Sequence, residues 1–203
     1  KVIIPVHLYG QMVDMKKLRV IASKHDIKIL EDCAHIIEGS RDGYRPGHHS
    51  DAAVFSFYAT KNIASGEGGA VVTSSESLIE DLALLRAHGM SKSASDRYSG
   101  AYKHWDMEVL GYKANMFDMQ AAMLLPQLVK IDRVLEKKES ICQYYQKRFD
   151  DVGISYPVVT KDSISARHLF TIWVDPSVRD NILKSLQAKG IGVAVNFKAV
   201  HTL

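Results

Sequence analysis

The chain has 203 residues, of which 46% are hydrophobic and 24% are charged, a composition typical of a globular protein with one domain and part of another. Lysine and arginine number 26 against 23 acidic residues, and the net charge of +3 is too small to indicate a nucleic-acid partner. No apolar run is long enough to span a membrane, and no segment of the signal-peptide type opens the sequence. With only two cysteines, the sequence predicts a cytoplasmic protein without a disulfide framework.

Both ends of the sequence carry a pattern of their own. Lys1 leads directly into an apolar strand pattern, and the sequence closes at Leu203 without a polar tail. Natural domains usually begin and end in exposed, loosely held segments. We therefore expect a chain that is truncated at both ends.

Strand and helix patterns alternate in the first part of the chain, which is typical of an α/β domain with a largely parallel sheet. An irregular loop is predicted at 90–110. Pro126 lies inside the helical pattern at 117–150 and is expected to kink or split that helix. The predicted strands lie at 2–8, 27–30, 52–57 and 69–73, and the predicted helices at 15–25, 74–88 and 117–150.

The pattern changes in the last quarter of the chain. Strands are predicted at 168–174 and 191–197, with a helix at 180–189 between them, as at the start of a smaller α+β domain. We therefore place a partial large domain, with an interdomain helix, at residues 1–150 and a partial small domain at residues 151–203.

Three polar residues lie at or just beyond the predicted ends of strands: Asp32, Ser56 and Lys61. In an open parallel sheet, ligands bind beyond the carboxyl ends of the strands, so these side chains are expected to converge on one site. Taken singly, each residue has a simpler interpretation: a helix cap, a small core residue and a solvated loop lysine. Their joint placement is what favours a common site.

The residue types at this site fit one cofactor. A partly desolvated lysine has a lowered pKa and can attack a carbonyl group to form a Schiff base. Pyridoxal phosphate needs such a lysine, an acid beside its ring nitrogen, a flat contact for its ring and donors for its phosphate. Lys61, Asp32, His35 and Ser56 can supply these groups in turn. This argument makes pyridoxal phosphate a candidate without singling it out.

Four short stretches then follow one another in a recognisable order. They read EDCAH at 31–35, FSFYATKN at 55–62, GEGG at 66–69 and GYKANM at 111–116. In order and spacing they resemble the DegT/DnrJ/StrS family of nucleotide-sugar aminotransferases, which are fold-type-I enzymes dependent on pyridoxal phosphate. The resemblance runs over nearly the whole chain. It implies a large α/β domain with a mostly parallel sheet and flanking helices, followed by a smaller α+β domain.

The resemblance also implies a role for each matching residue of the site. Lys61 is expected to form the Schiff base with pyridoxal phosphate and to move the proton during transfer. Asp32 is expected to pair with the ring nitrogen, His35 to stack on the ring and Ser56 to bind the phosphate. The implied reaction moves an amino group from glutamate to a keto sugar that is linked to a nucleotide diphosphate.

Three further positions are implied by the resemblance alone. Lys113 and Asn115 are expected to reach the phosphate of the partner subunit's cofactor, which implies a homodimer with shared active sites. Lys and Asn at these positions are similar to the subgroup that includes the UDP-4-amino-4-deoxy-L-arabinose aminotransferases. His201 resembles a residue on the sugar-nucleotide side of the cleft.

Two other hypotheses remain open. The chain could be a truncated or regulatory homologue that keeps the fold without full cofactor binding, or a plain α/β interaction domain in which Lys61 is only a loop residue. A metal site is not expected. The pair His48 and His49 has no carboxylate or cysteine at ligand spacing, so we interpret it as part of a polar loop.

Overall fold

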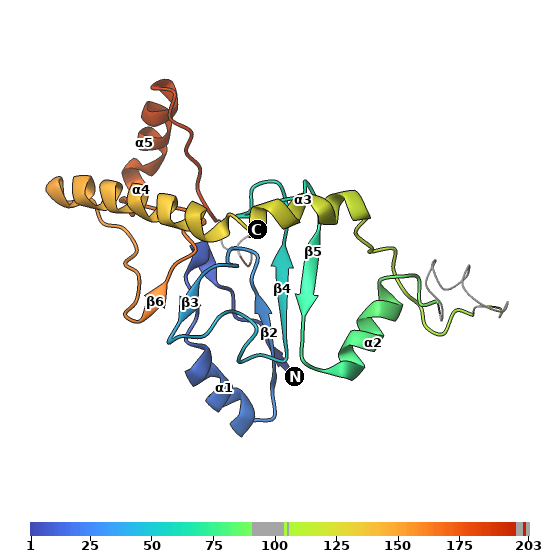
Figure 1. Cartoon of the computed structure of the whole chain (residues 1–203). Helices are drawn as coiled ribbons and strands as arrows, with labels where there is room; N and C mark the ends of the chain where they lie inside the picture. The colour runs from blue at the N-terminus through green and yellow to red at the C-terminus, as the bar shows by residue number, and fades with distance from the viewer. Residues whose placement is uncertain (91–103, 105, 198–200, 202–203) are drawn as a thin grey trace. The chain divides into compact units, whose positions relative to one another are not determined.

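The computed structural model describes residues 1–90, 104, 106–197 and 201 (Figure 1). Contacts divide the chain into a larger unit, Lys1–Cys142 with Val159–Phe170, and a smaller unit, Gln143–Val158 with Thr171–Leu203. Residues 159–170 thus group with the larger unit, while the domain boundary at residue 150 stays a prediction. The loop predicted at 90–110 lies for the most part outside the described residues.

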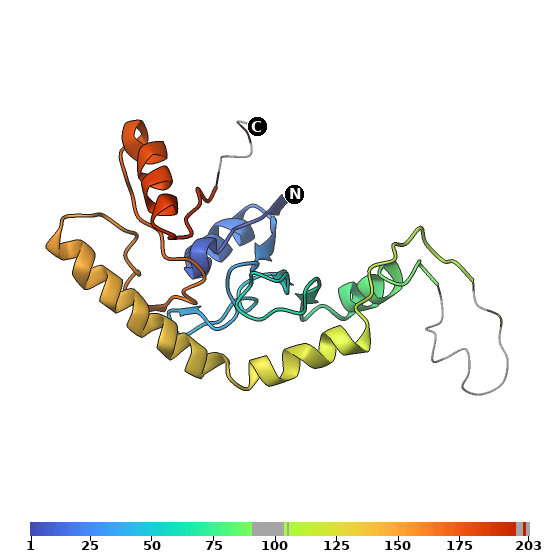
Figure 2. The same ribbon diagram turned by 90° about the horizontal axis from the view of Figure 1, so that it is seen from above.

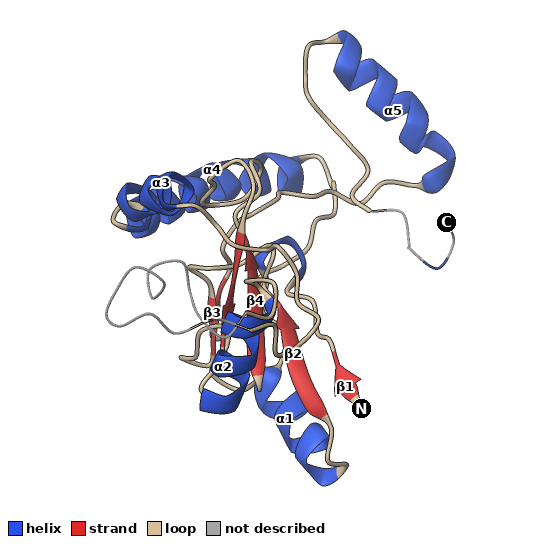
Figure 3. Cartoon of the chain, turned by 90° about the vertical axis from the view of Figure 1, so that its right-hand side faces the viewer, coloured by secondary structure: helices blue, strands red, loops and turns tan. Residues whose placement is uncertain are grey.

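The larger unit is built on a four-stranded sheet in the order β1-β2-β4-β5, seen edge-on in Figure 3. β1, β2 and β4 are parallel, and β5 pairs with β4 in the antiparallel sense. Asp32, the last residue of β2, lies opposite Val54 of β4, so both strands end at the same edge of the sheet. The predicted, mostly parallel sheet is confirmed. The strands are β1 (Val2–Ile3), β2 (Lys28–Asp32), β4 (Ala52–Ser56) and β5 (Gly69–Val72).

One face of the sheet packs on helix α1 (Met15–Lys24). The side chain of Asp14 caps this helix by accepting a hydrogen bond from the backbone N–H of Lys17. Since successive residues of a strand point to opposite faces, every second residue of β2 enters the core. The buried core residues are Met12, Met15, Ala22, Ile29, Cys33, Ile36, Ala53 and Ala166.

Helices α3 (Asp118–Leu128) and α4 (Ile131–Asp151) are separate, as Figure 2 shows. Pro126 lies in the last turn of α3, and the helix ends two residues later. A proline inside a helix removes a hydrogen bond and crowds the preceding turn, so the observed break agrees with the prediction. The side chain of Gln127 hydrogen-bonds both the N–H and the C=O of Ala64, which attaches α3 to the loop after β4.

Four short elements complete the larger unit. Helix α2 begins after Ser75, whose hydroxyl accepts a hydrogen bond from the N–H of Leu78. β3 and β6 form a two-stranded antiparallel ladder that attaches residues 159–170 to this unit. These elements are η1 (Leu8–Gly10), β3 (Ser40–Arg41), α2 (Glu76–Leu85) and β6 (Ser163–Ile164).

The smaller unit contains helix α5 (Pro176–Ala188), which Asp175 caps, close to the helix predicted at 180–189. The strands predicted at 168–174 and 191–197 are wrong: in the described part of the chain, neither stretch forms a strand. An apolar pattern indicates which side chains seek burial, but a strand also needs a neighbour that pairs with its backbone groups. None of the helices that the structure describes is long and apolar enough to cross a membrane.

A fully buried polar pair joins the segment after β1 to the centre of the sheet. Nε2 of His7 lies 2.6 Å from Oε2 of Glu31, and neither side chain is exposed. The N–H of Val13 donates to Nδ1 of His7, so the ring proton is on Nε2 and is donated to Glu31. The N–H of Gly47 donates to the other carboxylate oxygen. Burial raises the pKa of Glu31, but the hydrogen bonds from His7 and Gly47 outweigh it and the pKa lies below its usual value.

We predict that Glu31→Gln lowers the free energy of unfolding by about 3 kcal/mol. The two oxygens of Glu31 accept from His7 and Gly47, whereas glutamine has one oxygen, so one of these buried donors would face an NH₂ group. The matched variant Glu136→Gln changes an exposed helix residue and is expected to change the free energy of unfolding by less than about 0.5 kcal/mol. Urea unfolding at pH 7 measures both values. Equal midpoints for the two variants would contradict the prediction.

The hydrogen bond between His7 and Glu31 also predicts how the stability of the chain depends on pH. Because the pKa of Glu31 is lower in the folded chain than in the unfolded chain, its contribution to stability is complete above its ordinary pKa of about 4.3 and declines as the pH falls below that value. The wild-type chain should therefore lose more stability than Glu31→Gln between about pH 5 and pH 3.

Candidate functional site

Asp32 lies at the end of β2 with its backbone held from both sides. Its N–H donates to the C=O of Pro5 (2.9 Å), and its C=O accepts from the N–H of His7 (3.1 Å). Since Glu31 points into the core, alternation along the strand turns Asp32 to the opposite face. Its Oδ1 accepts a hydrogen bond from the N–H of Ala34 (3.0 Å), a turn that directs the chain toward residue 35.

His35 follows this turn and is half-buried. Its Nδ1 accepts a hydrogen bond from the N–H of Tyr9 (3.3 Å), so the neutral ring carries its proton on Nε2. Burial lowers the pKa of His35, the charge of Lys61 lowers it further, and the charge of Asp32 opposes them. The imidazole is therefore neutral at pH 7, and it lies within electrostatic reach of both residues.

Lys61 is positioned by a loop that leaves β4 at Ser56 and returns to β5. The N–H of Ala59 donates to the C=O of Gly66 (3.0 Å), and the N–H of Lys61 donates to the C=O of Tyr58 (2.9 Å). The hydroxyl of Ser56 accepts a hydrogen bond from the N–H of Tyr58. Both Ser56 and Lys61 are half-buried.

The glycines in this loop allow a close approach. Gly68 has a φ of +144°, and a Cβ at this position would collide with the side chain of Met116. The stretch at 66–69 therefore packs directly against the stretch at 111–116, although 40 residues and more separate them in the sequence. The φ of Gly68 also favours glycine, because residues with a side chain rarely adopt that backbone conformation.

The structure thus places the charges of Asp32 and Lys61 within electrostatic reach of His35, beyond the ends of β2 and β4. Ser56 lies at the same edge of the sheet, two residues beyond the partner of Asp32. The convergence of all four side chains on one site stays a prediction, as do their chemical roles.

Lys113 and Asn115 lie elsewhere on the larger unit, and both are exposed. Their segment runs along the end of α2, where Lys113 pairs with Ala87 and the N–H of Ala114 donates to the C=O of Arg86. His201 belongs to the smaller unit and is exposed. The roles implied for these three residues in binding a cofactor or a sugar remain predictions.

Sequence reasoning missed three residues that surround the site. His168 stacks on His35, with ring centroids 4.3 Å apart, and hydrogen-bonds Asn62 (3.0 Å), which in turn hydrogen-bonds Glu38 (2.7 Å). Asn62 follows Lys61 directly and is the last residue of the FSFYATKN stretch, but no role was predicted for it. His168 lies more than 100 residues away from both partners, and no spacing rule connects residues so distant in the chain.

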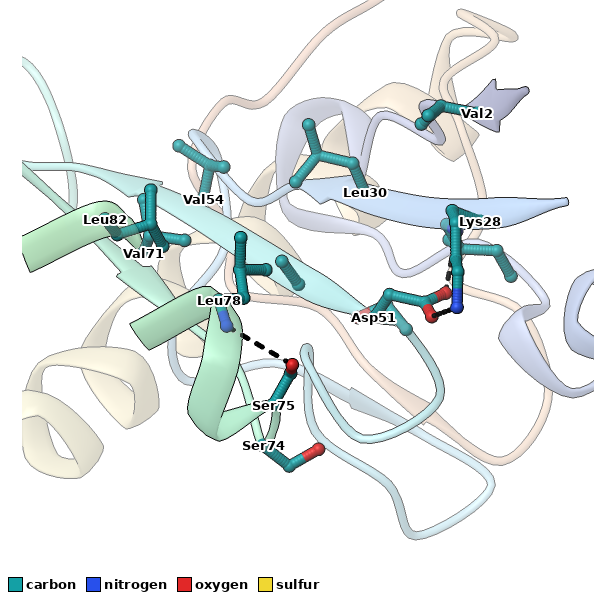
Figure 4. Close-up of a pocket in the computed structure, with 13 residues that line it drawn as sticks. Val2, Lys28, Leu30, Asp51, Val54, Val71, Ser74, Ser75, Leu78 and Leu82 are labelled. Atoms are coloured by element: carbon teal, nitrogen blue, oxygen red, sulfur yellow. Dashed lines mark hydrogen bonds and ion pairs between the residues drawn. The ribbon is translucent and has the colours of Figure 1, made fainter. Parts of the chain in front are cut away.

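A separate pocket of about 640 Å³ lies on the outward face of the sheet, lined mainly by aliphatic side chains that include Leu30, Val54 and Val71 (Figure 4). At its edge Nζ of Lys28 lies 3.1 Å from Asp51. None of the six residues predicted to bind a cofactor lines this pocket.

His7, Glu31 and Cys33 offer potential metal-ligand atoms within 4.8 Å of one another. Both ring nitrogens of His7 are already engaged, one with Val13 and one with Glu31. Burial, reinforced by the charge of Glu31, raises the pKa of the Cys33 thiol, which stays protonated and is a poor ligand. We interpret this cluster as part of the core.

The chain matches known proteins over its whole length. The family model of the DegT/DnrJ/EryC1/StrS aminotransferases matches residues 1–203. The spore coat polysaccharide biosynthesis protein SpsC of Bacillus subtilis (strain 168) is 39% identical over 209 residues, which cover 99% of this chain and 54% of SpsC.

Solved structures of aminotransferases are also similar to this chain. Spr1654 from Streptococcus pneumoniae, in its PMP form, superposes with a TM-score of 0.91 at 28% identity, over 100% of this chain and 57% of its own. Helicobacter pylori PseC, an aminotransferase involved in the biosynthesis of pseudoaminic acid, superposes with a TM-score of 0.88 at 28% identity, over 98% and 53%. The chain spans about half the length of the relatives it matches. It belongs to the DegT/DnrJ/EryC1/StrS aminotransferase family.

Proposed function

We propose that this chain carries the cofactor site of a pyridoxal-phosphate-dependent sugar aminotransferase. The observation that carries the proposal is the convergence of a carboxylate, a neutral imidazole and a half-buried lysine at the ends of two parallel strands. The amino donor proposed is glutamate, and the acceptor is a keto sugar linked to a nucleotide diphosphate. Family membership supports the reaction class.

The residues at the site fit the chemical groups of pyridoxal phosphate. When bound, this cofactor supplies an electron-withdrawing pyridinium ring that stabilises negative charge on the substrate carbon. The carboxylate of Asp32 holds the proton on the ring nitrogen, because an anion beside a base favours its protonated form. His35 offers a flat, uncharged face to the ring, and the hydroxyl of Ser56 donates to the phosphate.

Lys61 has two tasks in this proposal. Its amine is the group that would hold the cofactor covalently through the aldehyde carbon, with loss of water, until the amino donor replaces it. The freed amine then accepts the proton from the α-carbon of glutamate and later returns a proton to the carbon of the acceptor sugar. Its half-buried position within electrostatic reach of His35 supports this placement.

The wider assembly is also part of the proposal. Lys113 and Asn115 are exposed, as residues that reach toward a second subunit need to be. We place them at the phosphate of the partner subunit's cofactor in a cytoplasmic homodimer, and we place His201 on the sugar-nucleotide side of the site.

We predict that the purified chain mixed with pyridoxal phosphate gains the visible absorbance of a lysine-bound cofactor, and that Lys61→Ala abolishes it. Lys130→Ala, which removes an exposed lysine of the larger unit, should retain the absorbance in full. Borohydride reduction followed by peptide mass spectrometry should label Lys61. Label on another lysine, or no absorbance from a folded chain, would favour the hypothesis of a non-catalytic homologue.

We predict that Asp32→Asn weakens the binding of pyridoxal phosphate by about 10- to 100-fold, the value of one charge-assisted hydrogen bond. Asp42→Asn is the matched control, since Asp42 is exposed and has a φ of +53°, which asparagine tolerates. Titration of the cofactor absorbance measures both dissociation constants. An unchanged constant for Asp32→Asn would remove the carboxylate from the proposed site.

A further inference from the structure

Glu38, Asn62 and His168 form a connected chain of contacts that ends on His35. The amide nitrogen of Asn62 donates to Oε1 of Glu38 (2.7 Å) and to the C=O of Ala166 (2.9 Å). The amide oxygen of Asn62 lies 3.0 Å from Nδ1 of His168, whose ring stacks on His35 at 4.3 Å with an interplanar angle of 28°. All five residues belong to the larger unit.

These contacts determine the orientation of the Asn62 amide. Its NH₂ group faces two acceptors, a carboxylate and a carbonyl, so the oxygen is the atom that faces His168. An amide oxygen only accepts hydrogen bonds, and Nδ1 of His168 must therefore be protonated. In the neutral ring the other nitrogen, Nε2, then carries the lone pair.

The ring of His168 is neutral at pH 7. Burial is the largest cause that lowers its pKa, and repulsion by Lys61, Lys138 and a protonated His35 adds to it, so that the pKa is about 4. A neutral ring can stack closely on His35, whose own pKa is lowered by burial. Two imidazolium ions at this distance would repel each other.

Glu38 supplies the first contact of this chain of residues. Its side chain is fully buried, and Nζ of Lys138 lies 3.5 Å from the same oxygen that accepts from Asn62. The second oxygen, Oε2, is buried and makes no hydrogen bond in the described part of the chain. An apolar residue would avoid the energetic penalty of this unpaired oxygen, so the contribution specific to the carboxylate is the acceptor that orients Asn62.

We propose that Glu38, Asn62 and His168 are positioning residues, which hold the imidazole of His35 in the orientation that receives the cofactor ring. This inference rests on the function proposed above and adds to it residues outside the direct cofactor contacts. The N–H of Tyr9 fixes one nitrogen of His35, and the stacked ring of His168 fixes its plane. Pre-ordering this ring before binding reduces the entropy lost when the cofactor binds.

The first test examines the tautomer of His168 without any cofactor. In the whole chain labelled with ¹⁵N-histidine at pH 7, long-range proton–nitrogen spectra should show a protonated Nδ1 and an unprotonated Nε2. Asn62→Leu removes the acceptor, and the proton should move in part to Nε2. The same substitution at exposed Asn181, in the smaller unit, should leave the tautomer unchanged. A wild-type ring with its proton on Nε2 overturns the proposal.

The role of the Glu38 carboxylate is tested with two variants. Glu38→Gln keeps an acceptor oxygen for Asn62, whereas Glu38→Leu removes it. The proposal expects the Nδ1 proton of His168 to be retained in the first variant and partly lost in the second. If both variants keep the wild-type tautomer, Glu38 has no positioning role.

The second test measures the affinity for pyridoxal phosphate by titration of its visible absorbance. Asn62→Leu and His168→Asn are each expected to weaken binding about tenfold, while the absorbance at saturation stays at the wild-type level because Lys61 is intact. His168→Asn keeps a donor for Asn62 but lacks a ring, so it tests stacking even if Asn62→Leu fails to fold.

The outcomes separate the two proposals. Wild-type binding with unchanged affinity in folded Asn62→Leu or His168→Asn overturns the positioning role and leaves the proposed function intact. Absence of binding by the folded wild-type chain overturns the proposed function, and with it the role toward the cofactor.

Discussion

The buried hydrogen bond between His7 and Glu31 is the contact on which the site depends. It holds the inward face of β2 against the segment after β1, and the neighbouring residue, Asp32, then has to point outward. The backbone of His7 also donates to the C=O of Asp32, so one residue fixes both the core side and the site side of the strand end. A buried pair with its hydrogen bonds satisfied is costly to break, which makes this placement rigid.

The two histidines near Lys61 owe their lowered pKa first to burial and then to nearby positive charge. His35 and His168 are both neutral because burial lowers their pKa, and the charge of Lys61 acts in the same direction. The stacked pair can therefore be close to a lysine and still serve as a flat surface, which is what a planar cofactor requires.

The comparison with solved structures shows that the fold is shared even where the sequence differs. A TM-score of 0.91 at 28% identity means that the backbone is retained while most side chains differ. We expect the backbone to be retained at low identity because it depends on the alternation along β2 and β4, on a helix cap and on a few glycines. Many different apolar residues satisfy such a pattern.

The sequence by itself determined the local elements. Alternation and apolar runs predicted β2, β4 and β5, Pro126 predicted the break before α4, and strand ends indicated Asp32, Ser56 and Lys61. The strands expected at 168–174 and 191–197 were wrong, because a strand exists only where another backbone pairs with it. Tertiary structure alone decided that His168 stacks on His35 and that Glu38 orients Asn62. These contacts join residues up to 133 positions apart, and their specificity lies in distance and hydrogen-bond direction, which no local pattern in the sequence encodes.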